Sequence, residues 1–226
     1  MSASKIISSQ IPANGCIIFL HGLGDTSLGW SWLADRLKQP NGLKNADRIN
    51  YVFPNAPMSF VSGIQTMSTS WFDFESIEDI ESSYRSEDVF KSSQILKDII
   101  KEQIEKYKVP SEKIIIGGFS QGSVISLVTY ATLDVKIGGL ISLSGFLPLT
   151  DSLRKLSTSV NRDSPFLIGH GNEDDIILPK YADETSNTLY SLGFKNGNFH
   201  KYESLGHGIS LDELEEVVRF TKAILE

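Results

Sequence analysis

Short apolar runs alternate along the chain with longer segments of helical period. The short runs are rich in β-branched residues and predict strands at 16–20, 49–53, 113–117, 137–143, 165–169 and 199–203. The longer segments carry apolar residues at steps of three and four and predict helices at 87–107, 123–133, 180–192 and 211–225. Strands that alternate with helices are typical of a parallel sheet with crossover connections. The pattern therefore predicts an α/β fold, with a mostly parallel central sheet and helices on both faces.

Two of the predicted helices have recognisable ends. Ser86 stands directly before the segment 87–107 and is expected to cap it, because a serine hydroxyl accepts a hydrogen bond from a free backbone N–H. Pro179 and Gly193 flank the segment 180–192, as expected for residues that start and stop a helix. These signals support the boundaries that the apolar period gives.

The stretch from 54 to 84 fits neither period. It is rich in Ser, Pro and Gly, and a connection of this length is usually functional or disordered. It nevertheless carries large apolar side chains, at Phe60, Ile64, Met67, Trp71, Phe72 and Phe74. We therefore expect an ordered lid or a pocket wall in this stretch.

Length and composition fit one folded domain spanning 1–226. Hydrophobic residues make up 40% of the chain and charged residues 22%, which excludes the weakly hydrophobic, highly charged composition of a disordered protein. Lys and Arg number 21 against 28 Asp and Glu, which gives a formal net charge of −7. A surface of this sign repels phosphate backbones, so no nucleic-acid partner is expected.

The cysteine usage and the N-terminus bear on the compartment. Cys16 is the one cysteine and stands inside an apolar run, so we expect a buried core residue and no disulfide. The first ten residues lack the apolar centre of a signal peptide, and no apolar stretch approaches the roughly 18 residues that span a membrane. These features favour the cytoplasm, with the nucleus as a second location, and membrane contact that is at most peripheral and transient.

The sequence Gly118-Phe119-Ser120-Gln121-Gly122 matches the G-x-S-x-G motif of a nucleophile elbow. It follows a predicted strand and precedes a predicted helix, which is the context that the motif requires. In such a turn the serine adopts a strained backbone conformation, and the glycines leave room for the neighbouring strand and helix. We therefore predict Ser120 as a nucleophile exposed at the edge of the sheet.

A serine hydroxyl needs a neighbouring base to accept its proton, and the chain has four histidines. His21 and His170 directly follow predicted strands and are expected to make structural hydrogen bonds. His200 lies inside a predicted strand and is expected at its surface. His207 lies between the last strand and the last helix, on a glycine-flanked loop at the edge where catalytic loops gather. We predict His207 as the base.

The base in turn needs a carboxylate on its far ring nitrogen. In hydrolases with a nucleophile elbow this acid precedes the histidine along the chain. Glu173, Asp174 and Asp175 follow the predicted strand 165–169, and each also suits a solvated charge or a cap for the next helix. Position alone leaves Asp174 and Asp175 tied.

An oxyanion hole needs two backbone N–H groups, one of which comes from the residue after the nucleophile, here Gln121. The loop His21-Gly22-Leu23-Gly24-Asp25 follows the predicted strand 16–20 and can supply the other from Leu23 or Gly24. The alternative interpretation is a dinucleotide-binding G-x-G-x-x-G loop. That motif would require glycine at position 27, where the chain has Ser27, so we reject it.

Taken together, these motifs resemble the acyl-protein thioesterase family, whose members are also described as lysophospholipase-like carboxylesterases. The matching segments extend from Phe19 to His207 and are FLHGLGDTSLGW, YVFPNAP, SWFDF, IIIGGFSQGS, LSGFLPL, HGNEDD and LGHG. The resemblance implies an α/β-hydrolase fold and a serine hydrolase that cleaves fatty-acyl thioesters, foremost S-palmitoyl-cysteine on proteins. The substrates that it implies are S-acylated proteins, small acyl esters and thioesters, and lysophospholipids.

The resemblance also assigns the catalytic residues. It implies Ser120 as the nucleophile and His207 as the base. It selects Asp174 as the acid, because the family's acid stands four residues beyond the histidine of an HG pair, which here is His170. Asp175 then becomes a neighbour of the catalytic acid.

The same resemblance places the oxyanion amides on Leu23 and Gln121, and it suggests that Trp71 borders the acyl pocket. Other apolar residues of the stretch 54–84 are expected to line a channel for the acyl chain, at about 0.8 kcal/mol for each buried CH₂ group. The predicted substrate-binding residues are Trp71, Ile64, Met67 and Phe72.

Two other functions are compatible with the same fold. A general carboxylesterase or lysophospholipase would use the same three residues on a different natural substrate. A more remote alternative is a non-catalytic binding module, because a fold does not by itself determine a function. No cofactor or metal is expected, since the chain has neither an H-E-x-x-H motif nor a paired Cys/His ligand spacing.

Two features depart from the family pattern. Ser123 stands where many members have a second glycine after the S-Q-G sequence, which is expected to change the packing at the start of the helix. The chain begins Met1-Ser2-Ala3 and lacks the nearby cysteine at which some members are lipid-modified. The resemblance therefore does not extend to a lipid anchor.

Overall fold

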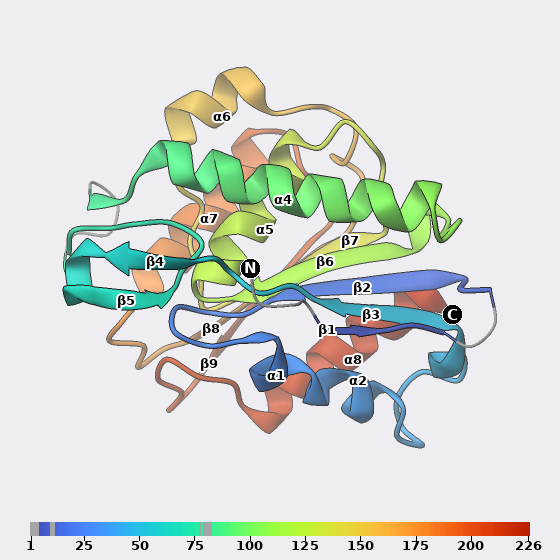
Figure 1. The fold of residues 1–226 in the computed structure, drawn as a ribbon. Coiled ribbons are helices and arrows are strands. Elements are labelled where there is room, and N and C mark those ends of the chain that lie inside the picture. The colour runs from blue at the N-terminus through green and yellow to red at the C-terminus, as the bar shows by residue number, and fades with distance from the viewer. Residues whose placement is uncertain (1–4, 10–11, 77, 79–82) are drawn as a thin grey trace.

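The computed structural model describes residues 5–9, 12–76, 78 and 83–226. In this part of the chain a seven-stranded sheet has the strand order β1-β3-β2-β6-β7-β8-β9, and β4 and β5 form a separate hairpin (Figure 1). β1 pairs with β3 in the antiparallel direction, and all the other neighbours in the large sheet are parallel. The strands are β1 (Lys5–Ile7), β2 (Gly15–Leu20), β3 (Ile49–Phe53), β4 (Met58–Val61), β5 (Thr66–Thr69), β6 (Ile114–Phe119), β7 (Gly139–Leu143), β8 (Phe166–Gly171) and β9 (Gly197–Tyr202).

All six predicted strands are present, with ends within two residues of their expected positions. β2 explains why their apolar runs are continuous. Its Cys16, Ile18 and Leu20 side chains belong to one hydrophobic cluster, whereas Ile17 and Phe19 belong to the other. Both faces of the sheet are thus buried, as a parallel sheet covered by helices requires. β1 escaped prediction because three residues at an edge carry too little pattern.

Helices cover both faces of the sheet, as predicted (Figure 1). One face carries α4, α5, α6 and α7, and the opposite face carries α1, α2 and α8. The bounds are α1 (Ser27–Trp30), α2 (Trp32–Leu37), α4 (Ser86–Glu105), α5 (Gln121–Thr132), α6 (Thr150–Leu156), α7 (Pro179–Ser191) and α8 (Leu211–Leu225). None of the helices in the described residues is both long and apolar enough to cross a membrane.

The four helices expected from the apolar period are α4, α5, α7 and α8, whereas α1, α2 and α6 are too short to show a period. The predicted cap at Ser86 is wrong by one position. Ser86 is the first helical residue, and Arg85 is the N-cap without a side-chain hydrogen bond. Glu87 and Asp88 instead favour this end, because their charges lie in the first turn of the helix.

The stretch 54–84 is neither one strand nor one helix. Its first part is the hairpin of β4 and β5, with the residue Gln65 in the left-handed region at φ 51°. Phe60, Ile64 and Met67 on this hairpin are exposed, whereas the following Trp71, Phe72 and Phe74 are buried. Residues 77 and 79–82 of the stretch lie outside the described residues. The exposed and the buried large apolar residues thus occupy different segments.

The strand order changes direction between β2 and β6, and ligands in open α/β sheets bind at such a switch point. The two strands are parallel neighbours, with Leu20 opposite Gly118. The loop that begins at His21 therefore lies beside the turn at Ser120. The topology brings the two segments with glycine-rich motifs to one edge of the sheet.

Candidate active site

Ser120 stands between β6 and α5 in a backbone conformation that L-residues rarely adopt, with φ 53° and ψ −121°. Its backbone N–H donates to the Leu143 carbonyl oxygen over 3.0 Å. A Cβ atom on Gly118 would overlap the backbone of Gly122, and a Cβ on Gly122 would overlap the backbone of Leu20. The surrounding packing thus holds the strained turn and presents the hydroxyl at the edge of the sheet.

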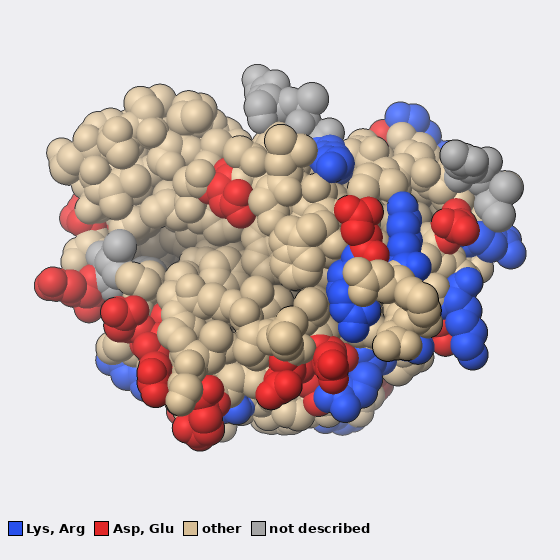
Figure 2. Space-filling model, turned by 90° about the horizontal axis from the view of Figure 1, so that it is seen from below, with Lys and Arg blue, Asp and Glu red and all other residues tan. Residues whose placement is uncertain are grey.

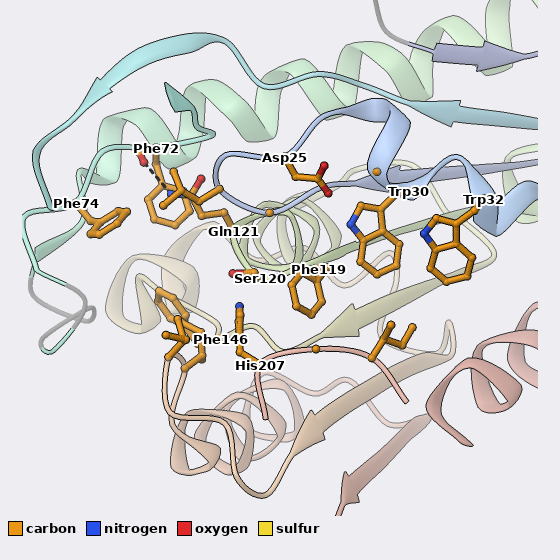
Figure 3. A pocket seen from close by; sticks show the side chains of 17 residues that line it. Asp25, Trp30, Trp32, Phe72, Phe74, Phe119, Ser120, Gln121, Phe146 and His207 are labelled. Atoms are coloured by element: carbon orange, nitrogen blue, oxygen red, sulfur yellow. Dashed lines mark hydrogen bonds between the residues drawn. The ribbon is translucent and has the colours of Figure 1, made fainter. Parts of the chain in front are cut away.

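His207 lies on the loop between β9 and α8 and is hydrogen-bonded to Asp174. Its Nδ1 lies 2.8 Å from the Asp174 Oδ2. The imidazole also packs against Phe119, the residue before Ser120, with ring centroids 4.9 Å apart. Figure 3 shows the imidazole extending from its loop toward Ser120. Because Nδ1 is engaged by the carboxylate, Nε2 is the nitrogen that faces the serine.

Asp174 is buried on the loop after β8 and has several hydrogen-bond donors. Its Oδ1 accepts from the backbone N–H groups of Ile176 and Ile177, over 3.0 and 2.8 Å. Its Oδ2 lies 3.3 Å from the His170 Nε2, in addition to the contact with His207. Burial alone would raise the pKa of Asp174, but these hydrogen bonds outweigh it and hold the pKa well below its usual range. The carboxylate is therefore ionised and fixed in orientation.

The neighbouring acids Glu173 and Asp175 are exposed. Of the three acids on this loop, Asp174 is the one that is buried against an imidazole. The structure thus brings Ser120, His207 and Asp174 together from three separate loops. Position in the sequence could not separate Asp174 from Asp175, but burial does.

The other histidines have structural contacts, as expected. His21 is buried, with its Nδ1 2.7 Å from the Gly22 carbonyl oxygen and its Nε2 accepting from the Ala56 N–H. Burial lowers the pKa of His21, which favours the neutral ring. His170 is buried with its Nε2 2.7 Å from the Ile177 carbonyl oxygen, and it supports the loop that carries Asp174. His200 is partly exposed on β9.

The two backbone amides predicted for the oxyanion hole lie on adjacent segments. Leu23 is in the loop after β2, and Gln121 is the first residue of α5. Within the described part of the chain, neither N–H has an acceptor, whereas the Gly24 N–H donates to the Thr69 carbonyl oxygen over 2.9 Å. Of the two donors that the sequence left open in this loop, Leu23 is therefore the one available to a ligand.

The side chain of Gln121 joins the nucleophile turn to the segment 70–72. Its Oε1 accepts from the Ser70 hydroxyl and from the Trp71 N–H, and its Nε2 donates to the Phe72 carbonyl oxygen. The Trp71 indole N–H donates to the His21 carbonyl oxygen over 2.8 Å. These buried contacts tie both loops with free amides to one segment.

A cavity of about 510 Å³ opens over Ser120 and His207. Of the four side chains predicted to bind substrate, Phe72 lines this cavity, and Trp71, Ile64 and Met67 do not. For these three side chains the structure differs from the prediction. Trp71 is turned into the protein by its indole hydrogen bond to His21, and Ile64 and Met67 are exposed on the β4–β5 hairpin.

Sequence reasoning missed several side chains that line the cavity, chiefly aromatic ones. They are Trp30, Trp32, Phe119 and Phe146, together with the carboxylate of Asp25, whereas Phe74, which also lines the cavity, belongs to the stretch that was expected to form a pocket wall (Figure 3). Phe119 lies within the elbow motif and Asp25 within the glycine-rich loop, so motif position could have indicated both. Trp30 and Trp32 come from short helices that no period revealed. No group of His, Cys, Asp and Glu side chains in the described residues could hold a metal ion.

Ser123, the departure from the family pattern, is buried beneath the elbow. Its hydroxyl lies 2.7 Å from the Ser142 hydroxyl on β7. A Cβ on Gly145 would contact the Ser123 side chain too closely, so the glycine leaves the room that this serine needs. The changed residue is thus accommodated with a hydrogen bond of its own.

The strand order, the turn at Ser120 after β6 and the histidine loop after the last strand define an α/β-hydrolase fold. A family model described as Phospholipase/Carboxylesterase matches residues 1–225. The chain therefore belongs to the phospholipase/carboxylesterase family of hydrolases. This confirms the resemblance predicted from the motifs.

Curated relatives match the chain over nearly its whole length. A protein of Candida albicans named acyl-protein thioesterase 1 is 46% identical, with 100% of each chain covered. A protein of Debaryomyces hansenii with the same name is 42% identical over 99% of this chain and 97% of the relative. Among solved structures, Arabidopsis thaliana SOBER1 has a TM-score of 0.86 at 26% identity, covering 95% of this chain and 100% of the other. Zea mays acyl-protein thioesterase 2 has a TM-score of 0.84 at 25% identity, with both chains fully covered.

Proposed function

We propose that this protein is an acyl-protein thioesterase, which releases fatty acids, foremost palmitate, from cysteine residues of other proteins. The observation that carries the proposal is the contact of 2.8 Å between His207 and the buried Asp174, on the edge where Ser120 faces an apolar cavity. The names of the relatives support the thioester substrate. The substrates are therefore S-acylated proteins and small acyl thioesters.

In the proposed first step the Ser120 hydroxyl attacks the acyl carbonyl carbon while the His207 Nε2 takes its proton. Asp174 stabilises the imidazolium that forms and holds the ring in one tautomer. The backbone N–H groups of Leu23 and Gln121 stabilise the negative charge that develops on the carbonyl oxygen. The free N–H of each residue supports this assignment.

In the second step the C–S bond breaks, and the imidazolium returns its proton to the departing cysteine thiolate. A thiol has a pKa of about 8.5, so a thiolate leaves with less assistance than an alkoxide needs. Water then gives a proton to His207 while its oxygen attacks the acyl carbon. The bond from this carbon to the Ser120 oxygen breaks, and His207 returns the proton to that oxygen. The products are the free fatty acid and the regenerated Ser120 hydroxyl.

A carboxylesterase or lysophospholipase activity is the second candidate, because the family model is described as Phospholipase/Carboxylesterase. The same three residues would cleave an oxygen ester by the same steps. The apolar cavity suits the fatty chain of either substrate. The two functions differ only in the leaving group, and therefore in the rate of the step in which that group departs.

The test is hydrolysis of a palmitoyl-cysteine peptide and of a lysophospholipid by the purified protein. Ser120→Ala should lower turnover of the peptide by roughly four to six orders of magnitude. Ser191→Ala, which changes an exposed serine on α7, is the matched control and should retain activity. Equal activity of Ser120→Ala and wild type would contradict the nucleophile, and faster turnover of the lysophospholipid would favour the second candidate.

We place this activity in the cytoplasm. Cys16 is buried and free, and a chain with a single reduced cysteine suits a reducing compartment. The substrates in this setting are acylated proteins, reached by peripheral and transient contact with membranes.

A further inference from the structure

The cavity over Ser120 has two lobes with different walls. Figure 3 shows three phenylalanines on one side of Ser120 and His207, and two tryptophans with a phenylalanine on the other. We call these the Phe lobe, lined by Phe72, Phe74 and Phe146, and the Trp lobe, lined by Trp30, Trp32 and Phe119. An acyl substrate has two substituents on its carbonyl carbon, so two lobes on opposite sides of the nucleophile have room for both.

The lobes differ in their access to solvent. Phe72, Phe74 and Phe146 are each at most 3% exposed. Trp32, in contrast, is 36% exposed and stacks on Trp30 with ring centroids 5.6 Å apart. The three rings of the Phe lobe are thus buried, whereas the Trp lobe has an aromatic side chain at the surface. A leaving group that is part of a protein must extend to the surface, and a fatty chain need not.

The lobes also differ in charge, because the Asp25 carboxylate belongs to the Trp lobe. It lies against Gly29, next to Trp30, so closely that a Cβ atom on Gly29 would overlap it. Its Oδ1 accepts from the Thr26 N–H over 2.7 Å. Among the residues that line the cavity, none is Lys or Arg. This carboxylate therefore has no cation of its own inside the cavity.

This charge assigns the direction in which a substrate lies. A fatty chain in the Trp lobe would remove water from the Asp25 carboxylate without replacing its hydrogen bonds, which is unfavourable. The Phe lobe has no such group among its side chains. The acyl chain therefore belongs in the Phe lobe, and the leaving group belongs in the Trp lobe.

On this basis, and resting on the function proposed above, we propose that the Trp lobe is a subsite for the leaving group. In it, Asp25 binds the cationic side chain of a Lys or Arg residue beside the acylated cysteine. A carboxylate and tryptophan rings are the two protein groups that attract ammonium and guanidinium ions. Trp32 supplies the exposed ring and Asp25 supplies the charge.

The surface around the site carries negative charge, which matches a cationic leaving group. Glu173 and Asp175 are exposed on the loop that also carries Ile176, which lines the cavity. Figure 2 shows that, on the face seen from below, most Lys and Arg lie on one half, whereas the hollowed half carries Asp and Glu with few Lys or Arg. Negative charge around the cavity favours encounter with a basic peptide over an acidic one.

The experiment compares palmitoyl-cysteine peptides that have Lys, norleucine or Glu beside the cysteine and are otherwise identical. For the wild type we expect kcat/KM to be about ten-fold higher with Lys than with norleucine, and lowest with Glu. Asp25→Asn keeps an oxygen for the Thr26 N–H but removes the charge, so the Lys-to-norleucine ratio should fall to about one. Trp32→Leu should lower the same ratio about three-fold.

Asp35→Asn is the matched control, because Asp35 is an exposed acid on α2 that does not line the cavity. It changes the net charge by the same amount and should leave the ratio as in the wild type. No preference for Lys in the wild type, a preference retained in Asp25→Asn, or an equal loss in Asp35→Asn would each overturn the subsite.

A second measurement separates the subsite from the proposed function. The deacylated peptides are tested as inhibitors of the hydrolysis of a chromogenic short-chain ester, which requires the serine but no thioester. The Lys peptide should inhibit the wild type more strongly than the norleucine peptide, and the difference should vanish in Asp25→Asn. If no palmitoyl peptide is cleaved but this selectivity is present, the thioesterase function fails and the subsite stands. Without selectivity in inhibition, the subsite fails whatever the thioesterase activity.

Discussion

Asp174 and Glu213 are two buried carboxyl groups close to β8, and they differ in protonation. Asp174 follows the strand and has hydrogen-bond donors for both oxygens. Glu213, in the first turn of α8, lies against Gly169 of the strand so closely that a Cβ there would overlap its Oε1. Neither oxygen of Glu213 has a hydrogen-bond partner among the described residues.

Their pKa values move in opposite directions for this reason. Burial raises the pKa of Glu213 to about 8. Burial also acts on Asp174, but the hydrogen bonds to His170, His207 and the backbone outweigh it and lower the pKa. Burial alone thus does not determine the charge of a carboxyl group; its donors do. The site needs an ionised acid at Asp174, and the loop around it supplies the donors.

The largest expected effect is on activity, where replacing Asp174 and replacing Glu213 should have very different consequences. Asp174→Asn should lower kcat roughly 10⁴-fold, because an amide cannot hold His207 in the required tautomer or stabilise its imidazolium. Glu213→Gln, equally buried, should change kcat only a few-fold, and Asp175→Asn should act like the wild type. The measurement is steady-state hydrolysis of a palmitoyl thioester. A larger loss at position 175 than at 174 would reverse the assignment of the acid.

The next effect is on the pH dependence of stability, in which Glu213 and Asp174 should also differ. The folded pKa of Glu213 is about 8, and its unfolded pKa is about 4.3. Between these values the folded protein keeps a proton that the unfolded chain releases, so stability falls as pH rises, by up to about 1.4 kcal/mol per pH unit. Glu213→Gln should remove this slope. Denaturant unfolding of both proteins at pH 5, 6, 7 and 8 measures it, and parallel curves would contradict a neutral Glu213.

The contribution of Asp174 to stability changes with pH in the opposite direction. Because its folded pKa is depressed, its contribution to stability is fully present above its unfolded pKa of about 3.9 and is lost as pH falls through the folded pKa. The acid of the site therefore stays ionised throughout the range in which Glu213 titrates. Acid unfolding of Asp174→Asn should accordingly be less steep than that of the wild type.

A smaller effect concerns the support of Asp174. His170→Phe removes the Nε2 that lies 3.3 Å from Asp174 and 2.7 Å from the Ile177 carbonyl oxygen. We expect kcat to fall roughly ten-fold, consistent with the loss of one buried hydrogen bond to a charged group. The pKa of Asp174 should rise, so in acid unfolding the loss of its contribution to stability should begin at a higher pH. His200→Phe on β9 is the control and should leave the pH profile in place.

The elbow and the strands could be predicted from the sequence because their signals are local. Gly118 and Gly122 carry the turn within five residues, and the buried strands are continuous apolar runs. The choice of Asp174 over Asp175 could not come from position, because both lie on one loop and only packing against His207 separates them. The resemblance to a family supplied what the pattern lacked.

The walls of the site were the least predictable part. Trp71 was expected at the acyl pocket, but its indole N–H turns inward to the His21 carbonyl oxygen, a contact between residues 50 positions apart. Ile64 and Met67 carry apolar side chains that a short hairpin holds away from the cavity. The burial of Glu213, in contrast, could have been predicted. This residue stands four residues before Val217 and therefore lies on the buried face of α8.

The central claim is that Ser120 becomes an attacking group through His207 and Asp174. A fluorophosphonate probe tests it directly, because it forms a covalent adduct only with an activated serine. We predict one adduct per chain, mapped by mass spectrometry to Ser120, with a labelling rate at least about 100-fold lower in His207→Ala and in Asp174→Asn. An adduct on another residue, or an unchanged rate in His207→Ala, would contradict the account.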